Sequence, residues 1–375
     1  MSIVAAELRV PSFAVLRTHA CGARLGRLRT RHGVVDTPAF MPVGTHGSVK
    51  GVTPAQLEEL GATIVLSNAY HLAQRPGVDV VRELGGLHAL MGWRGPILTD
   101  SGGFQVMSLA GLVRVDDDGV SYRSHVDGKA GHLRPEDAIA VQEGLGVDVA
   151  MSLDECVPAG ATATQVARAV GRTTAWAARG LAARRLDEMA LFGIVQGALD
   201  PEQRRVSAGE IVSLHFDGYA TGGLSVGEPP EQTARIAALT VELLPRDRPR
   251  YLMGTGTPGD LLRFAAMGYD LFDCVLPTRN ARNGMLFTRE GKLMIRNACH
   301  ARDPRPLDEQ CACYTCRHFS RGALRHLHLA HEMLGAQLAT LHNLHFYLNL
   351  MREIRAAVAE GVFPGRAAVA AGAWA

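Results

Sequence analysis

Residues 98–105 read LTDSGGFQ, an apolar run that ends on a carboxylate and then on two glycines. The segment 96–98 has the composition of a short buried strand, and Asp100 follows its end. Gly102 and Gly103 then allow the backbone to turn sharply beneath a bound molecule. Alone, this segment favours a simpler interpretation, a strand followed by an Asx-type turn. A functional site becomes the better interpretation because the same arrangement recurs along the chain.

Seven other apolar runs of strand length occur, and segments with the length and period of helices separate most of them. One helix is expected to begin after Thr53, because Pro54 suits the first helical position and Gln56 completes a capping box. Strands that alternate with helices form a parallel sheet, and eight such units predict a closed (β/α)8 TIM barrel. The predicted strands are 39–43, 63–68, 96–100, 147–155, 191–197, 218–225, 250–256 and 271–277, and the predicted helices include 135–144, 163–186, 201–214, 230–244 and 258–267.

A doubly wound α/β sheet is the competing architecture. Such sheets commonly bind a dinucleotide, but no GxGxxG motif follows the first strand and the chain has no P-loop. We therefore expect the barrel and no nucleotide cofactor.

Composition indicates an ordinary globular protein, with 47% hydrophobic and 20% charged residues. No apolar run approaches the roughly 20 residues of a membrane span, and residues 1–11 do not resemble a signal peptide. The seven cysteines are an odd number and are unevenly spread, which is unlike a disulfide framework. These features together predict a cytoplasmic protein with no membrane partner.

The formal net charge is only +2, but residues 274–330 contain ten Lys or Arg against four acids. A basic block of this kind predicts a polyanionic partner such as nucleic acid. A solvated basic surface is the alternative, since the chain uses arginine heavily throughout.

Polar residues and glycines gather at the carboxyl ends of the predicted strands, where barrel enzymes place their catalytic groups. Two separate carboxylates, Asp100 and Asp273, suit a glycosyl-type reaction in which one attacks an anomeric carbon and the other moves protons. Asp154 and Gln196 suit recognition of the polar edge of a heterocycle. Phe104 and Met253 would sandwich a flat ring, although ordinary core packing explains them equally well. The residues at this end are Ser67, Asn68, Asp100, Asp154, Glu155, Gln196, Gly222, Gly223, Gly254 and Asp273.

Cys311, Cys313 and Cys316 lie within six residues of one another, and a helical segment with several histidines follows. Three thiolates and one imidazole are the ligands of a closed tetrahedral Zn²⁺ site, which is structural and not catalytic. Spacing leaves the fourth ligand open among His326, His328, His331, His342 and His345.

The expected organisation is one catalytic domain over residues 1–375. Asp-Gly turns at 118–119 and 127–128 predict inserted hairpins after the third strand. The parts are an N-terminal antiparallel cap at 12–36, the barrel at 37–280 with the insert at 106–133, a zinc-binding subdomain with C-terminal helices at 281–360, and a tail at 361–375.

Seven segments in this order resemble the bacterial tRNA-guanine transglycosylases, and the resemblance spans roughly residues 12–360. They read TDSGGFQVMSL, MSLDEC, GIVQG, GYATGGLSVGEP, YLMGTGTP, FDCVLPTRNARNG and CACYTC. The resemblance implies a zinc-containing barrel that replaces guanine at the wobble position of GUN anticodons with a queuosine precursor. Its partners would be the tRNA anticodon loop, a deazaguanine base and a second copy of the chain in a homodimer.

The resemblance also implies roles for individual residues. Asp273 would be the nucleophile on the ribose, and Asp100 the general acid and base. Cys311, Cys313, Cys316 and His342 would bind the zinc ion, and Arg279 and Arg282 would contact the RNA. The residues that would bind the base are Asp154, Gln196, Gly223, Leu224, Phe104, Met253 and Cys156.

Cys156 and Val226 match the bacterial branch, which favours 7-aminomethyl-7-deazaguanine over queuine as the incoming base. Ala198 and Ser225 depart from the family pattern beside the pocket and leave base selectivity open. A catalytically silent tRNA-binding subunit would lack one of the two carboxylates, whereas this chain has both. A metal-dependent barrel hydrolase would need a histidine pair after the first strand, where only His46 occurs. The roles of His46 and of the inserted hairpins stay open, as does the preferred tRNA.

Overall fold

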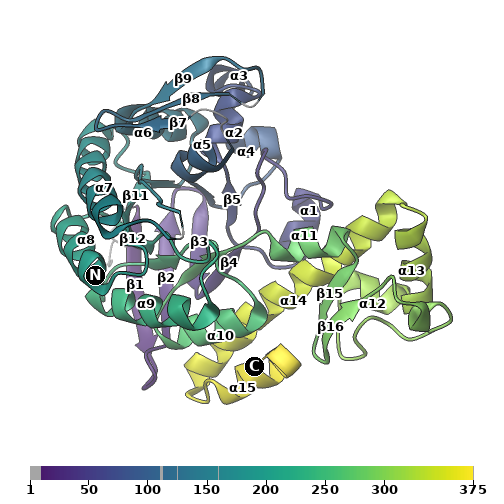
Figure 1. Ribbon diagram of the computed structural model, residues 1–375. Coiled ribbons are helices and arrows are strands. Elements are labelled where there is room, and N and C mark those ends of the chain that lie inside the picture. The colour runs from purple at the N-terminus through teal and green to yellow at the C-terminus, as the bar shows by residue number, and fades with distance from the viewer. Residues whose placement is uncertain (1–9, 110–112, 125, 159, 375) are drawn as a thin grey trace, which may run out of the picture.

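A computed structural model describes residues 10–109, 113–124, 126–158 and 160–374, and its centre is a parallel eight-stranded barrel (Figure 1). The strands are paired in the order β4-β14-β13-β12-β11-β10-β6-β5. An isolated parallel bridge between Val43 and Leu66 joins the two outer strands, with the amide of Gly44 donating to the Leu66 carbonyl at 2.6 Å. The predicted barrel is therefore confirmed. Its strands are β4 (Ala39–Met41), β5 (Val65–Ser67), β6 (Ile97–Thr99), β10 (Val149–Met151), β11 (Ala190–Val195), β12 (Gly218–Thr221), β13 (Arg250–Leu252) and β14 (Leu271–Asp273).

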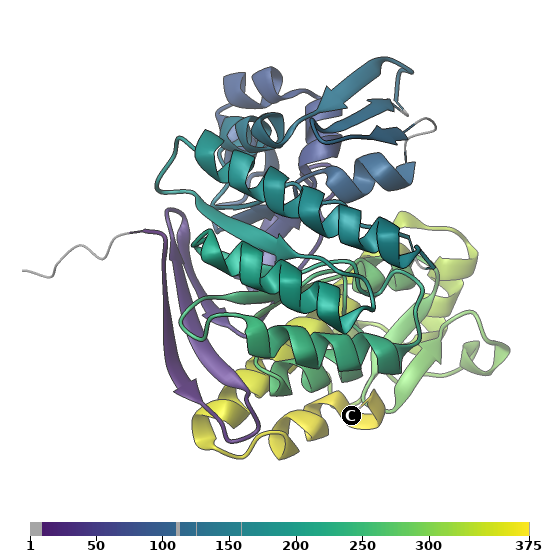
Figure 2. The same ribbon diagram turned by 60° about the vertical axis from the view of Figure 1, so that its left-hand side comes forward.

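Helices surround the barrel on its outer side (Figures 1 and 2). The first begins with the predicted capping box, in which the Thr53 hydroxyl accepts from the Gln56 amide and the Gln56 side chain accepts from the Thr53 amide. Three short helices, and not one, connect β5 to β6. The helices are α1 (Pro54–Glu59), α2 (Ala69–Gln74), α3 (Val78–Glu83), α4 (Gly86–Met91), α5 (Gly103–Leu109), α6 (Pro135–Leu145), α7 (Ala163–Ala183), α8 (Pro201–Ser213), α9 (Pro230–Leu243) and α10 (Pro258–Ala266).

An antiparallel sheet of β1 (Ser12–Thr18), β2 (Arg24–Thr30) and β3 (Gly33–Thr37) covers one end of the barrel (Figure 2). Two buried carboxylates attach it. Arg24 pairs with Asp270, just before β14. His32 and His88 each donate to a different oxygen of Asp148, at 2.9 and 3.1 Å.

His32, His88 and Asp148 are residue types that can bind a metal ion, and their ligand atoms lie close together. The Asp148 carboxylate, however, also accepts hydrogen bonds from the backbone amides of His32 and Ile97. Its oxygens are therefore satisfied by protein donors.

The predicted insert forms a second antiparallel sheet of β7 (Val113–Val115), β8 (Val120–Arg123) and β9 (Ala130–Leu133). Side chains of α7 hold it, because the Trp176 indole and the Arg179 guanidinium both donate to the carbonyl of Asp117. The sheet lies beside α6 at the edge of the molecule (Figure 1).

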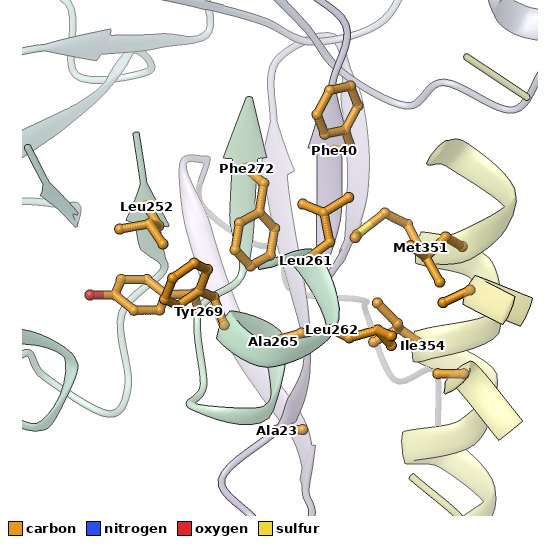
Figure 3. Close-up of a cluster of buried hydrophobic side chains, with 14 of the residues drawn as sticks. Ala23, Phe40, Leu252, Leu261, Leu262, Ala265, Tyr269, Phe272, Met351 and Ile354 are labelled. Atoms are coloured by element: carbon orange, nitrogen blue, oxygen red, sulfur yellow. The ribbon is translucent and has the colours of Figure 1, made fainter. Parts of the chain in front are cut away.

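The C-terminal part surrounds α14 (Met333–Glu360), which runs from the cysteine-rich region along the outside of the barrel (Figure 1). Met351 and Ile354 of α14 face Leu261 and Leu262 of α10, which in turn cover Phe272 and Phe40 of the barrel (Figure 3). Burying each such side chain stabilises the fold by about 1.5–3 kcal/mol. The other elements are α11 (Leu276–Arg282), β15 (Met285–Thr288), β16 (Gly291–Met294), η1 (Ala298–His300), α12 (Tyr314–His318), α13 (Arg321–Leu329), α15 (Gly365–Ala371) and η2 (Gly372–Trp374).

The stretch expected as a tail contains α15, with Phe363, Ala367 and Ala371 buried against the core that includes α14. In the described part of the chain, no helix is both long enough and apolar enough to cross a lipid bilayer.

Candidate functional site

A cavity of about 700 Å³ opens at the carboxyl ends of the barrel strands. It is the end opposite the N-terminal sheet, because Asp148 and Asp270, which anchor that sheet, directly precede β10 and β14 and so lie at the amino ends of these strands. The cavity brings together residues from most of the strand ends. Among the residues singled out in the sequence, its walls contain Asn68, Asp100, Phe104, Asp154, Cys156, Gln196, Gly222, Gly223, Leu224, Met253, Gly254, Asp273 and Arg279.

Asp273 ends β14 with one carboxylate oxygen held by the protein. Its Oδ1 accepts the Tyr251 hydroxyl at 2.6 Å and the Gly254 amide at 2.8 Å. Among the described residues, both hydrogen bonds of this carboxylate fall on Oδ1 and none on Oδ2. Burial raises the pKa of Asp273, while the Tyr251 hydroxyl and the Gly254 amide oppose that rise.

Asp100, one residue beyond β6, is almost fully buried at 9% exposure. The Asn68 amide donates to its Oδ2, and the Ala69 backbone amide donates to Oδ1 at 2.9 Å. Burial raises the pKa of Asp100 to about 6, and the negative charge of Asp273 contributes to the same shift. A carboxyl group with this pKa can both release and accept a proton near neutral pH.

Asp154 and Gln196 form a pair on the next wall of the cavity. The Gln196 Nε2 donates to Asp154 Oδ2 at 2.6 Å, and the Ser101 hydroxyl donates to Oδ1 at 3.4 Å. Burial raises the pKa of Asp154 to about 6. The Gln196 Oε1 is buried and has no hydrogen-bond partner among the described residues. A buried acceptor without a donor is costly, so this oxygen is poised to accept from a ligand.

The Gly222-Gly223 turn lies directly against this pair. A Cβ atom on Gly223 would come within 2.3 Å of Gln196 Oε1, and one on Gly222 within 2.7 Å of its Nε2. Only glycine fits here, so the backbone of this turn is exposed to whatever occupies the cavity.

Phe104 and Met253 differ in their surroundings. The Phe104 side chain is 48% exposed at the start of α5, although it lines the cavity. Met253 is partly buried and packs against the apolar cluster inside the barrel. Burial raises the pKa of Cys156 to about 12, so its thiol is neutral at physiological pH and is a poor nucleophile.

Arg279 and Arg282 lie on α11, directly after β14. Arg279 lines the cavity, whereas Arg282 is outside its wall. The positive charge of Arg279 helps to lower the pKa of Arg282, after burial as the main cause. The two guanidinium groups therefore lie close enough to interact, on the helix that follows the Asp273 strand.

The cysteine cluster lies away from this cavity and could hold one metal ion. Cys311, Cys313, Cys316 and His342 place their ligand atoms within 4.8 Å of one another. The Nδ1 of His342 lies 3.8, 3.5 and 3.3 Å from the three sulfur atoms, in the same order. The Nε2 of His342 donates to the Phe287 carbonyl at 2.8 Å, which leaves Nδ1 as the ligand atom.

His345 is another of the candidates that spacing left open, and its Nδ1 approaches Cys311 alone, at 3.5 Å. His342 therefore completes a four-ligand group, as the resemblance implied.

Sequence analysis did not single out Tyr251 as part of the site. An aromatic residue in an apolar strand is normally read as core, and Tyr251 is indeed 1% exposed. Only the position of its hydroxyl next to Asp273 distinguishes it. His46, by contrast, does not line the cavity, and its ring meets the ring of His71 edge to face at 4.7 Å.

Comparison with known proteins agrees with these features. A family model described as queuine tRNA-ribosyltransferase matches residues 19–371. A queuine tRNA-ribosyltransferase of Moorella thermoacetica is 54% identical over 351 residues, which cover 93% of this chain and 94% of the relative. The protein of the same name from Desulforudis audaxviator is 56% identical over 342 residues, covering 91% of this chain and 92% of that protein.

Proposed function

This chain belongs to the queuine tRNA-ribosyltransferase family, and from that premise we propose how its barrel cavity exchanges a base in tRNA. The protein is a tRNA-guanine transglycosylase of queuosine biosynthesis. We propose that guanine at the wobble position of GUN anticodons is replaced by 7-aminomethyl-7-deazaguanine. One observation carries this proposal: Asp273, whose carboxylate is hydrogen-bonded through Oδ1, lines the same cavity as the Asp154–Gln196 pair.

The first displacement uses Asp273 as the nucleophile. Its Oδ2 forms a bond to C1′ of the ribose while the bond from C1′ to N9 of guanine breaks, and the electron pair leaves with the guanine. Tyr251 and Gly254 hold Oδ1, so they aim Oδ2 and restrain its rotation. The product of this step is a covalent enzyme–RNA intermediate and a free base.

Asp100 moves the proton in both displacements. The departing guanine takes up a proton from Asp100, and the incoming base later returns one to it before attacking C1′ and releasing Asp273. A pKa of about 6 suits this exchange, because both protonation states are populated near neutral pH. Asn68 and the Ala69 amide keep the carboxyl group in place between the two steps.

The base lies between Phe104 and Met253 in this proposal, with its polar edge toward Asp154, Gln196 and the backbone of Gly223 and Leu224. Cys156 contributes a neutral, apolar part of the wall. An ionised Asp154 accepts N–H groups, and the unpartnered Gln196 Oε1 accepts another. This donor and acceptor pattern suits guanine and 7-deazaguanines, which present the same pyrimidine edge.

Arg279 and Arg282 contact the RNA backbone beside the flipped nucleotide. Their place on α11, directly past the nucleophile, supports this role, since phosphates flank the attacked ribose. Because tRNA is the substrate, we propose that the protein works in the cytoplasm.

The ion held by Cys311, Cys313, Cys316 and His342 is Zn²⁺ in this proposal, since three thiolates and one imidazole suit its tetrahedral preference. Four protein ligands would fill the tetrahedral coordination and leave no position for a substrate, which supports a structural role. We propose a single catalytic domain in which residues 281–360 form the zinc-binding part.

We also propose that two copies form a homodimer through the junction of α13 and α14. Leu329, Met333 and Leu334 are exposed there by 48%, 82% and 46%, and neighbouring exposed apolar residues are typical of protein interfaces.

Incorporation of labelled guanine into a tRNA with guanine at the wobble position tests the reaction. We expect exchange by the wild type and none by Asp273→Asn, whose amide cannot attack C1′. Asp247→Asn, which changes an exposed carboxylate, is the control and should retain full exchange. Covalent enzyme–RNA complexes should appear on denaturing gels only when Asp273 is present.

A wild-type protein that binds tRNA but exchanges no base would instead support the silent-subunit interpretation. Competition between 7-aminomethyl-7-deazaguanine and queuine then decides which base the enzyme prefers.

A further inference from the structure

Arg204, near the start of α8, carries a buried positive charge. Its side chain is 0% exposed. Its neighbour Arg205 pairs with Glu202, and Arg184 at the opposite end of the barrel pairs with Asp217. Arg204 forms no ion pair within the ranges that the structure describes. Burying a guanidinium without a carboxylate is costly, so its hydrogen bonds must offset that cost.

All three hydrogen bonds of the guanidinium go to backbone carbonyls around the base pocket. Nη1 donates to Val195 at 2.9 Å, and Nε donates to Ala198 at 2.9 Å. Nη2 donates to Gly223 at 3.5 Å, the longest of the three. A single side chain therefore joins the end of β11 to the loop after β12.

The carbonyls of Val195 and Ala198 lie before and after Gln196 in the chain. Ser207, three residues after Arg204 and on the same face of α8, accepts the backbone amide of Gln196 at 3.0 Å. Ala198 has a positive φ of 48°, a left-handed conformation that is strained for a residue with a Cβ atom. The bond from Arg204 to the Ala198 carbonyl helps to hold this unfavourable turn.

The third carbonyl belongs to the peptide that joins Gly223 to Leu224. In a planar trans peptide the N–H points opposite to the C=O. By holding the Gly223 carbonyl, Arg204 therefore also sets the direction of the Leu224 N–H. The Gln196 side chain packs against this same turn, within 2.3 Å of where a Gly223 Cβ would lie.

We propose that Arg204 is a positioning residue for base recognition, which ties the backbone around Gln196 to the Gly223–Leu224 peptide and sets the distance between them. The inference rests on the proposed function of that pocket. Arg204 touches no reacting atom, since it acts through the peptide that joins Val195 to Gln196 and through the peptide that joins Gly223 to Leu224. Lysine carries all its N–H donors on one nitrogen and cannot reach carbonyls as far apart as those that the three guanidinium nitrogens bond, so it can replace arginine only in part.

The test compares Arg204→Met and Arg204→Lys with the wild type in guanine exchange, with separate KM values for guanine and for tRNA. Arg184→Met is the matched control, because it removes a largely buried arginine that bonds Asp217 and two backbone carbonyls away from the pocket. Calorimetric binding of guanine to the free enzyme is measured in parallel. Assays are run below the melting temperature of the least stable variant.

We expect Arg204→Met to raise the KM and the Kd for guanine by about tenfold or more, as loss of charged hydrogen bonds implies. The KM for tRNA should rise by less than about threefold, since most of its contacts lie outside the base pocket. Arg204→Lys should fall between Met and the wild type, and Arg184→Met should lower only the melting temperature.

The inference is overturned if the Arg204 variants keep the wild-type affinity for guanine, or if Arg184→Met weakens guanine binding equally. Should Arg204→Met fail to fold, Arg204→Lys decides the matter by the same criterion. Failure of the proposed function would appear differently, as absence of exchange by the wild type.

Discussion

Three carboxylates share one cavity but have different hydrogen-bond partners, and these partners distinguish them residue by residue. Asp273 is held by a hydroxyl and a backbone amide on one oxygen only. Asp100 is held on both oxygens. Asp154 is tied to the Gln196 amide. In the proposed reaction these environments suit an attacking group, a proton carrier and a base-binding group.

Replacing Tyr251 by Phe should slow exchange through Asp273. The Tyr251 hydroxyl favours the ionised form of Asp273, so its removal raises the pKa of that carboxyl further and frees its rotation. We expect kcat to fall by about 10- to 100-fold, and the acid limb of the pH profile to move to higher pH.

Tyr269→Phe is the control for the Tyr251 variant, because this buried hydroxyl bonds Thr221 and the Ala237 carbonyl, neither of which touches Asp273. A Tyr251→Phe enzyme with unchanged kcat and pH profile would contradict the prediction.

The pH dependence of exchange should also reflect the raised pKa values. Asp154 has to be ionised to accept N–H groups, and its pKa is about 6. We expect kcat/KM for guanine to fall as the pH drops through about 6, and not near 4 as for an ordinary carboxyl group. A profile that stays flat down to pH 4.5 would argue against the role of Asp154.

Stability should change with pH in the opposite direction. Folded Asp100 and Asp154 keep protons up to about pH 6, whereas unfolded carboxyl groups release them near 3.9. These two groups therefore favour the folded state most below about pH 4, and the gain is lost as the pH rises through 6. At pH 8 an Asn at position 154 should raise the melting temperature, and this advantage should shrink at pH 5.

At the scale of elements, α14 connects the cysteine cluster to the barrel. Its His342 faces the three cysteines, and Asn343 beside it donates to the Pro277 and Met285 carbonyls. These carbonyls belong to α11 and to the start of β15. The helix that carries the metal ligand therefore also holds the helix with the proposed RNA contacts.

Removal of the metal should accordingly weaken tRNA binding more than guanine binding. We expect Cys316→Ser to lose about one equivalent of zinc by elemental analysis and to melt roughly 5–10 °C lower. The KM for tRNA should rise, because α11 loses its support, while the Kd for guanine stays nearly constant. Cys299→Ser, which changes an exposed cysteine outside the cluster, should leave all three quantities unchanged.

For the whole molecule, the two ends of the barrel differ: one end attaches the N-terminal sheet, and the other end contains the cavity. At one end the N-terminal sheet is fastened by Asp148 and Asp270, away from the cavity. At the other end lie the cavity, α11 and the C-terminal part with its exposed apolar junction. Binding of tRNA and self-association are thus both expected on the side of the C-terminal part.

Met333→Glu should convert a homodimer into monomers, because a carboxylate in an apolar interface cannot be hydrated there. Light scattering after size exclusion measures the mass directly. Val369→Glu is the matched control, since Val369 is 75% exposed on α15 and lies outside the junction. A wild-type mass of about 40 kDa at micromolar concentration, which is that of one chain, would contradict the dimer.

Local sequence accounts for much of this protein. Alternating apolar runs and helical segments, with the Thr53 capping box, were sufficient to predict the eight-stranded barrel, because burial and capping depend on neighbouring residues. The three cysteines predicted a metal site, and the recurrence of polar residues at strand ends indicated which end of the barrel carries the cavity.

Tertiary structure decided the features that depend on residues far apart in the chain. The Tyr251 hydroxyl meets Asp273 across neighbouring strands, and Arg204 reaches Gly223 from helix α8. His342 was distinguished from His345 by its distances to all three sulfur atoms and by the Phe287 carbonyl. Hydrogen bonds and burial act over a few ångströms in space, so spacing along the chain carries no signal for them.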